Sequence, residues 1–414
     1  MISDDYHRFP ARRLPALAAT TISSLIAGLL IAQTSQAQQW TLQPELRAGY
    51  EFDDNARLRS DEAQIQEIDG LILEGSLGIG YNTQRTTFEL TPRVRSRIYD
   101  ETPDVDSDDQ FLDFNFGHET LKGEFRVRSS YDRESVRTAE RADPDFDVDD
   151  PDDIPIDETG LLLIDARRER FRIAPDWSYD VTERLVLGLE ASYTDVSYDE
   201  AIAGFLVDYT DQRVGGSLGW NFTERTRGYV GGGVRKYEND FDNNEVDGVG
   251  ATLGIESELS QTTRVQAEIG YEDTEQSSTG ESDANFVANF NLVRRLETIT
   301  MLAQYRRDVA ATGAGRVTAR DSLNLTLRKQ FTERVSGALG VRAYQTEGVG
   351  DEVLTFEERD YTEFRAQLAV ALSRAFSVEG DYRHARIDRS NLEGSADGNS
   401  IILWLVYRPT AIIN

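Results

Sequence analysis

The sequence predicts an all-β protein, a transmembrane antiparallel up-and-down β-barrel. Three observations support this prediction: long segments in which apolar and polar residues alternate, short polar breaks that recur mostly about 40 residues apart, and an N-terminal segment of the secretory kind. After that segment, no apolar run reaches the roughly eighteen residues that a membrane helix requires. The alternating strands are therefore the elements expected to cross a membrane.

The first element, residues 1–37, has the features of a signal peptide. Arginines precede an apolar stretch at 14–32, and Ala37 ends a sequence of small residues suited to cleavage. Threonines and serines interrupt the apolar stretch, which favours cleavage over a retained membrane anchor. No Pro/Ser-rich linker divides the rest of the chain, so we expect a single barrel domain at 38–414.

Composition excludes several classes of function. The chain has 414 residues and a formal net charge of −30, which disfavours nucleic acid as a partner. It has no cysteine, so it has neither a disulfide nor a catalytic thiolate, and its stability is expected to come from an extended hydrogen-bonded sheet. No cofactor is predicted.

Alternation of apolar and polar residues marks the strands. It is clear at 42–52, 71–81, 265–271 and 364–372. Because successive side chains of a strand point to opposite faces, each of these segments has one apolar and one polar face. The strands extend over about ten residues or more, against the five or six that are usual in soluble proteins.

Short polar breaks, several of them with the letters Thr-Glu-Arg, separate these strands. They lie near Thr83, Thr120, Thr182, Thr223, Thr262, Glu297, Thr332 and Arg374. Longer polar connections alternate with the breaks, for example ENDFDNNEVDG from Glu238 and EDTEQSSTGESD from Glu272. Eight short turns and nine long loops give about 18 strands; sixteen is the alternative count, because the sixth strand is poorly marked. Short periplasmic turns and long acidic extracellular loops are typical of outer-membrane barrels.

Two soluble architectures are alternatives. A solenoid would repeat more tightly than this chain does, and a propeller would need four short strands in each interval. Aromatic residues at predicted strand ends favour the membrane barrel, because such residues gather at membrane interfaces. They are Tyr50, Tyr81, Tyr131, Tyr193, Tyr271, Tyr305, Tyr407, Phe222, Phe331 and Phe376.

The segment PELRAGYEFDDNARL at 44–58 and the strand-turn texture of residues 40–408 resemble the uncharacterised β-barrel porin families of Gram-negative outer membranes. Many of these families accompany exopolysaccharide systems. The resemblance implies an outer-membrane location among lipids and lipopolysaccharide, with a surface polysaccharide as a candidate substrate. It brings no catalytic motif. The chain departs from the pattern at its end, where Tyr407 is followed by RPTAIIN instead of ending at an aromatic residue.

A barrel of sixteen to eighteen strands encloses an aqueous channel, so the polar faces should line a lumen. Three predicted strands carry arginines at alternate positions, which we call the basic wall: Arg93, Arg95, Arg97, Arg126, Arg128, Arg168, Arg170 and Arg172. Two others carry the acidic wall: Glu256, Glu258, Glu268 and Glu272. We expect the two walls to face each other nearly across the lumen and to create a transverse field. The alternative is that the arginines pair with lumen carboxylates such as Asp113 and Glu124.

The loop after the fifth strand is a candidate constriction loop. It is rich in aspartate: Asp143, Asp145, Asp147, Asp149, Asp150, Asp152 and Asp153. Attraction to the basic wall would draw it into the lumen, and its prolines would stiffen it. The alternative is a solvated acidic loop. If it enters the lumen, deletion of 142–156 should raise single-channel conductance.

These features predict a porin-like channel for a surface polysaccharide, including an anionic one that binds guanidinium groups, or for small polar solutes. The alternative is a non-conducting structural or adhesive surface barrel. An enzyme is not predicted, because residues 38–414 hold only His118 and His384, and neither lies near a serine and an acid in the sequence. Without cysteine or paired histidines, no metal site is predicted. The solute, the direction of transport and the oligomeric state stay open.

Overall fold

A computed structural model describes residues 39–99, 105–141, 166–199, 206–240, 245–277, 280–313, 315–348, 358–389 and 394–413. The predicted signal peptide and its boundary with the barrel lie outside these residues and stay predictions. The aspartates of the candidate constriction loop also lie outside the described residues, and their entry into the lumen stays a prediction. Among the described residues, no helix has the length and apolar character needed to cross a bilayer.

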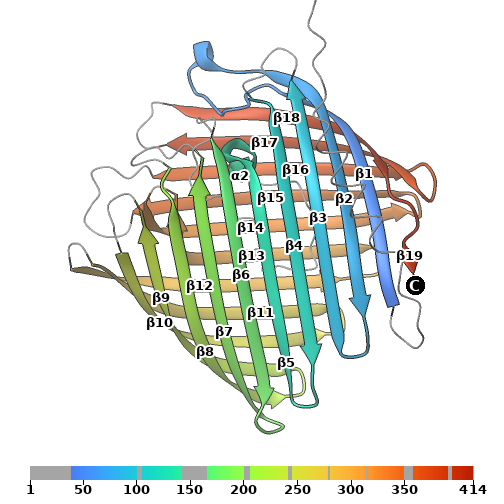
Figure 1. Ribbon diagram of the computed structural model, residues 1–414. Helices are drawn as coiled ribbons and strands as arrows, with labels where there is room; N and C mark the ends of the chain where they lie inside the picture. The colour runs from blue at the N-terminus through green and yellow to red at the C-terminus, as the bar shows by residue number, and fades with distance from the viewer. Residues whose placement is uncertain are drawn as a thin grey trace, which may run out of the picture. The chain divides into compact units, whose positions relative to one another are not determined.

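Eighteen long antiparallel strands make the wall (Figure 1). They are β1 (Gln39–Asp53), β2 (Ile68–Asn82), β3 (Thr86–Tyr99), β4 (Ser107–Glu119), β5 (Gly123–Ser135), β6 (Arg167–Asp180), β7 (Leu185–Tyr198), β8 (Tyr209–Thr223), β9 (Thr226–Asn239), β10 (Glu245–Ser260), β11 (Thr263–Gln276), β12 (Glu281–Arg295), β13 (Ile299–Thr312), β14 (Arg316–Thr332), β15 (Val335–Gly348), β16 (Arg359–Ala371), β17 (Phe376–Arg389) and β18 (Ser395–Tyr407). The other elements are η1 (Glu62–Gln64), α2 (Val136–Arg141) and β19 (Ile412–Ile413). The predicted count of eighteen is confirmed.

The sheet closes on itself. β1 pairs with β2 along its whole length and with β18 from Leu46 to Asp53. Beyond Tyr407, the two residues of β19 continue the wall by pairing with Thr41 and Leu42 of β1. The tail that departs from the usual terminal pattern therefore extends the pairing of the first strand toward its N-terminal end. Closure leaves no sheet edge at this seam, as a strand structure in lipid requires.

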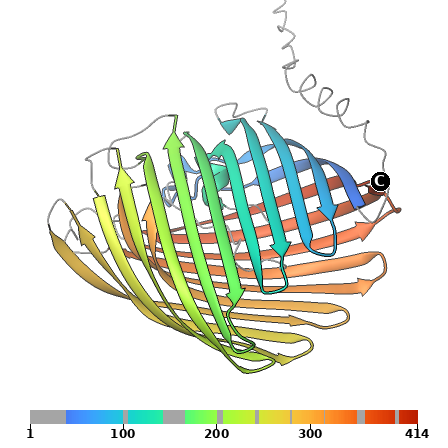
Figure 2. The ribbon, with the colours of Figure 1, turned by 60° about the horizontal axis from the view of Figure 1, so that its bottom comes forward.

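All eight predicted short turns are confirmed, and they join successive strands at one end of the barrel, the short-turn end (Figure 2). The repeated threonine has a specific role in them. The hydroxyl of Thr332 accepts hydrogen bonds from the backbone N–H groups of Arg334 and Val335, at 3.2 and 3.1 Å. The hydroxyls of Thr83 and Thr182 accept equivalent bonds. A side-chain acceptor thus satisfies the N–H groups of the reversing chain.

The opposite end, the long-loop end, differs from the prediction at two connections. EDTEQSSTGESD was predicted as a loop, but β11 continues to Gln276 and β12 begins at Glu281. Likewise β13 and β14 are separated by residues 313–315 only. The polar residues still pair in register, for example Thr274 with Asp283. Strands that rise above the membrane need no apolar face, so their residues read as loop in the sequence.

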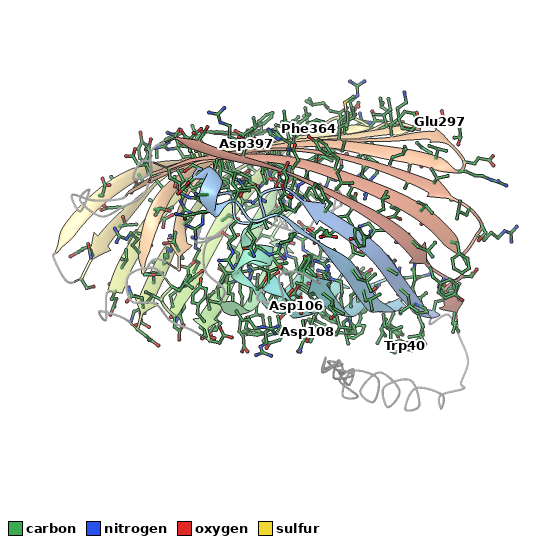
Figure 3. All side chains as sticks on the ribbon, turned by 90° about the horizontal axis from the view of Figure 1, so that it is seen from above. Trp40, Asp106, Asp108, Glu297, Phe364 and Asp397 are labelled. Atoms are coloured by element: carbon green, nitrogen blue, oxygen red, sulfur yellow. The ribbon has the colours of Figure 1, made fainter. Side chains whose placement is uncertain are left out.

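Apolar side chains cover the outer face of the barrel. On β1 the exposed residues include Leu46, Tyr50 and Phe52, and on β18 Ile401, Leu403 and Leu405. Trp40 and Phe364, labelled in Figure 3, belong to the same set. The residues between them are polar or small, for example Arg47 and Glu51 on β1. The chain therefore has the apolar outside and polar inside of a membrane-spanning barrel.

Candidate functional site in the barrel lumen

The basic wall faces the lumen. On β3 the exposed residues Val94 and Ile98 occupy the outward positions, which places Arg93, Arg95 and Arg97 inside. The same alternation holds on β5, around Phe125, and on β6, around Phe171. It places five further arginines inside: Arg126, Arg128, Arg168, Arg170 and Arg172.

These arginines are held by carboxylates. Arg95 Nε donates to Glu74 at 2.7 Å, and Arg97 Nη1 donates to Asp109 at 2.7 Å. Arg93 also lies 3.5 Å from Glu74. One carboxylate on β2 thus serves two arginines of β3, which fixes the guanidinium groups against the wall.

The pairing continues on β5 and β6. Arg168 Nη2 donates to Glu134 at 2.8 Å, and Arg170 Nε donates to Asp132 at 2.9 Å. Arg126 donates to Asp176 at 3.0 Å and lies 3.8 Å from Glu124. Arg128 and Arg172 also interact with other groups. The arginine rows therefore resemble the predicted alternative, a wall stiffened by ion pairs, more than a row of uncompensated cations.

The acidic wall also faces inward and has its own cations. Glu256 accepts from Arg227 at 2.7 Å, Glu258 from Arg264 at 3.1 Å, and Glu272 lies 3.5 Å from Arg235; Glu268 shares their inward face. Only β7, β8 and β9 separate β6 from β10. β3, however, is seven and eight places from β10 and β11, and diametrically opposite strands in a closed sheet of eighteen are nine places apart. The glutamates therefore lie nearly across from Arg93, Arg95 and Arg97, and closer to the arginines of β6.

The helix α2 lies at the start of the loop predicted to constrict the lumen. Arg137 Nη2 donates to the hydroxyl of Tyr99 at 3.0 Å, and that hydroxyl donates to Glu51 at 2.6 Å. Thr138 accepts from Arg97 at 2.7 Å. Burial opposes the charge on Arg137, but Tyr99 and Glu51 raise the pKa of its guanidinium group above the ordinary value. The helix is therefore bound to lumen-facing groups of β1 and β3.

The connection between β1 and β2 packs against lumen-facing residues of the later strands. Leu58, which is 0% exposed, packs with Tyr344, Tyr361 and Ile387. Asn55 Nδ2 donates to the carbonyl of Asp397 at 2.9 Å. No sequence pattern predicted a role for this connection, although the apolar Leu58 within a polar stretch was a signal that it is buried.

A third element that packs into the lumen is the tip of the hairpin formed by β13 and β14. Its described residues, 308–313 and 315–317, are called the hairpin tip. Val309 and Val317 are buried in a cluster with Tyr209, Tyr237 and Val246, from β8, β9 and β10. The hairpin tip thus reaches strands that are three to six places away in the sheet. No sequence pattern predicted this contact, because its partners are about 100 residues apart.

A row of uncharged polar side chains lines the lumen between these charged regions. Gln266, Asn291, Gln304 and Asn324 are directly paired across β11, β12, β13 and β14. They lie on the inward face, opposite in parity to exposed residues such as Phe290 and Leu325. Asn291 is 4% exposed, and neither of its amide atoms has a hydrogen-bond partner among the described residues. We call these four side chains the amide row.

Both histidines of the barrel lie on outward-facing positions. His118 Nδ1 contacts the hydroxyl of Thr86 at 3.0 Å, and His384 Nδ1 contacts Asn399 Oδ1 at 3.1 Å. Within the described residues, neither histidine forms a hydrogen bond to a serine or a carboxylate. In the same part of the chain, no group of three or more acidic or histidine side chains is suited to hold a metal ion. The two histidines of the barrel therefore take no part in the polar lining of the lumen.

No protein-family model and no curated protein sequence matches the chain. Among solved structures, OccAB4 of Acinetobacter baumannii is 11% identical, over 91% of this chain and 99% of that one, with a TM-score of 0.42. OpdO of Pseudomonas aeruginosa is 11% identical, over 90% and 97%, with a TM-score of 0.44. The siderophore receptor PirA of A. baumannii is 8% identical, over 91% and 81%, with a TM-score of 0.45. Likeness at this level supports no argument about solute or mechanism.

The class of protein follows from the fold and the lumen. A closed antiparallel sheet of eighteen strands, apolar outside and polar inside, with short turns at one end, is an outer-membrane β-barrel of the porin-like kind.

Proposed function

We propose that this barrel is a porin-like channel for hydroxyl-rich polar solutes, with oligosaccharides of a surface polysaccharide as the favoured class. The amide row carries the proposal. An amide group both donates and accepts hydrogen bonds, as a sugar hydroxyl does, and its lack of charge suits a neutral solute. In Asn291 both amide atoms are buried and lack a partner among the described residues, and a solute that displaces the side chains covering them would supply one.

An anionic polysaccharide is supported less well. Guanidinium groups bind carboxylates strongly, but the basic wall is already paired with Glu74, Asp109, Asp132, Glu134 and Asp176. An anionic solute would have to compete with these carboxylates. The paired wall therefore favours polar solutes with little or no net charge.

A second candidate is the non-conducting surface barrel. It is favoured by a different observation: the connection between β1 and β2, helix α2 and the hairpin tip all pack against lumen-facing residues at the long-loop end. If these elements close the lumen permanently, the barrel has a structural role.

Conductance in a planar bilayer separates the two candidates. The refolded wild-type protein should give stable current steps, and a neutral glucose oligosaccharide should block them. Replacing Asn291 and Gln304 by alanine should weaken the block by roughly tenfold, the loss of about one net hydrogen bond. Asn115→Ala is the matched control, because Asn115 occupies an inward position of β4, outside the amide row.

The other outcomes are equally definite. If a polyuronate blocks the current and the neutral sugar does not, the basic wall, and not the amide row, binds the solute. A protein that inserts but gives no current would favour the structural barrel.

A further inference from the structure

The wall between β12 and β13 is paired only in part. The two strands pair from Ala288 with Arg307 to Arg295 with Thr300. Residues 281–287 of β12 continue to pair with β11. In the described part of the chain they have no strand partner on their other side, so they form a free sheet edge. The residues that would extend the register, 308–312 of β13, pair with β14 like the rest of that strand, but no pairing with β12 is seen for them, and they belong to the hairpin tip.

The hairpin tip is held inside the barrel by hydrogen bonds from β8, β9 and the residue Val207 that precedes β8. Arg235 Nη1 and Arg213 Nη2 donate to the carbonyl of Val309, at 2.8 and 3.0 Å. The backbone N–H of Val207 donates to the carbonyl of Gly313 at 2.7 Å. Asn239 Nδ2 donates to the carbonyl of Gly315 at 2.7 Å. Groups of β8, β9 and the segment before β8 thus satisfy backbone carbonyls of the hairpin tip in the observed position.

The apolar side chains of the hairpin tip are compatible with two positions of this segment, one inside the barrel and one in its wall. On β13 the exposed residues Met301 and Tyr305 mark the outward parity, and Val309 shares it. On β14 Leu323 and Leu325 mark it, and Val317 shares it. Val309 and Val317 are nevertheless buried inside the barrel, 0% and 6% exposed. The same two side chains would continue the apolar outer face if the hairpin tip lay in the wall.

From these observations we propose that the hairpin tip is a gate with two docking positions. In the observed position it crosses the lumen and packs against β8, β9 and β10. In the second position, 308–312 pair with 283–287 of β12, in the register that Ala288 and Arg307 begin, and the lumen opens. A free sheet edge is unfavourable unless it is wet or paired, so the edge of β12 gives the hairpin tip a place to dock. This proposal rests on the proposed channel function, because the gate would regulate passage through that channel.

Two engineered disulfides test it, and the absence of native cysteine makes both selective. A Cβ atom at position 315 would lie 3.8 Å from the Cβ of Val207, the spacing of an ordinary disulfide. V207C/G315C should therefore lock the closed position. V287C/D308C places cysteines on directly opposite residues of the extended register and should trap the open position.

The matched control is T41C/G80C at the short-turn end, where a Cβ at position 80 would also lie 3.8 Å from its partner, the Cβ of Thr41. It cross-links β1 to β2 without touching the hairpin tip. The single variant G315C controls for strain, because Gly315 has a φ of +80°.

We expect oxidised V207C/G315C to lose at least about tenfold of its open probability and to recover it on reduction. Oxidised V287C/D308C should form and stay open, and T41C/G80C should conduct like the wild type in both redox states. Equal conductance of V207C/G315C before and after reduction would overturn the gate. So would failure of V287C/D308C to cross-link under conditions in which T41C/G80C does.

The channel and its regulation can fail separately. If V207C/G315C and V287C/D308C both cross-link but no variant conducts, the hairpin tip moves between two positions and the proposed channel function is wrong.

Discussion

The contacts at the two ends of this barrel differ in how far apart their residues lie in the sequence. At the short-turn end, residues adjacent in sequence make the contacts: the hydroxyls of Thr83, Thr182 and Thr332 cap their own turns. At the long-loop end, residues far apart in sequence meet. Leu58 packs with Ile387, and Arg235 bonds Val309. The contacts of the short-turn end can therefore be predicted from neighbouring residues in the sequence, whereas those of the long-loop end form only when the whole sheet closes.

The difference also concerns stability. Buried side chains are concentrated in the lumen near the long-loop end, where the apolar clusters and ion pairs are found. The side chains of the short turns are mostly exposed, for example Leu121 at 88%. Matched substitutions at the two ends should consequently have unequal effects.

The largest difference should come from a buried and an exposed glutamate. Glu363 is 0% exposed, accepts from the hydroxyl of Tyr361 at 2.5 Å and is paired with Arg365. Glu363→Ala leaves a buried guanidinium group uncompensated and should cost about 4 kcal/mol of unfolding free energy. Glu124→Ala, whose side chain is 38% exposed in its pair with Arg126, should cost less than about 1 kcal/mol. Urea titration of the refolded barrel measures both, and equal values would contradict the difference between the ends.

Two leucines make the next comparison. Leu58 is buried between the β1–β2 connection and β15–β17, so Leu58→Ala should cost about 3 kcal/mol through lost burial and the cavity that remains. Leu121→Ala in a short turn should change the unfolding free energy by no more than about 0.5 kcal/mol. Tryptophan fluorescence during the same titration reports both. A loss below 1 kcal/mol for Leu58→Ala would mean that the connection does not stay packed in the lumen.

A smaller effect is expected from the turn threonine. Thr332→Val keeps the shape of the side chain but removes the acceptor for two backbone N–H groups, and should cost about 1 kcal/mol. The hydroxyl of Thr300 makes no hydrogen bond within the described residues, so Thr300→Val is the control. If both variants unfold at the same urea concentration, the hydroxyl does not explain why threonine recurs in the turns.

The smallest effect should follow from ending the chain at residue 411, which removes β19. Only two residue pairs with β1 are lost, and both isoleucines are exposed. The unfolding free energy should fall by no more than about 0.5 kcal/mol. A barrel that no longer assembles in lipid vesicles would show instead that the tail is required for closure, which band mobility on unheated gels would reveal.

The sequence predicted the strands and their count because both follow from local patterns. Alternation identified segments such as 42–52, now in β1, and the Thr-Glu-Arg breaks located the turns. The inward direction of the basic wall also followed, since parity along a strand is fixed once the outward residues are known. The upper ends of β11 and β12 were predicted as loop, because strands above the membrane lack the apolar face that the prediction relied on.

The identity of the side chains that meet inside the closed sheet became known only from the folded barrel. The carboxylates that hold the basic wall come from neighbouring strands whose register the sequence does not state, such as Glu74 for Arg95. The partners of the hairpin tip lie on β8 to β10, and they come within reach only when the barrel closes. Strand periodicity is a property of successive residues, so the sequence by itself determined a membrane barrel with a polar lumen. Contacts across that lumen depend on strand register and closure, so they became visible only in the folded barrel.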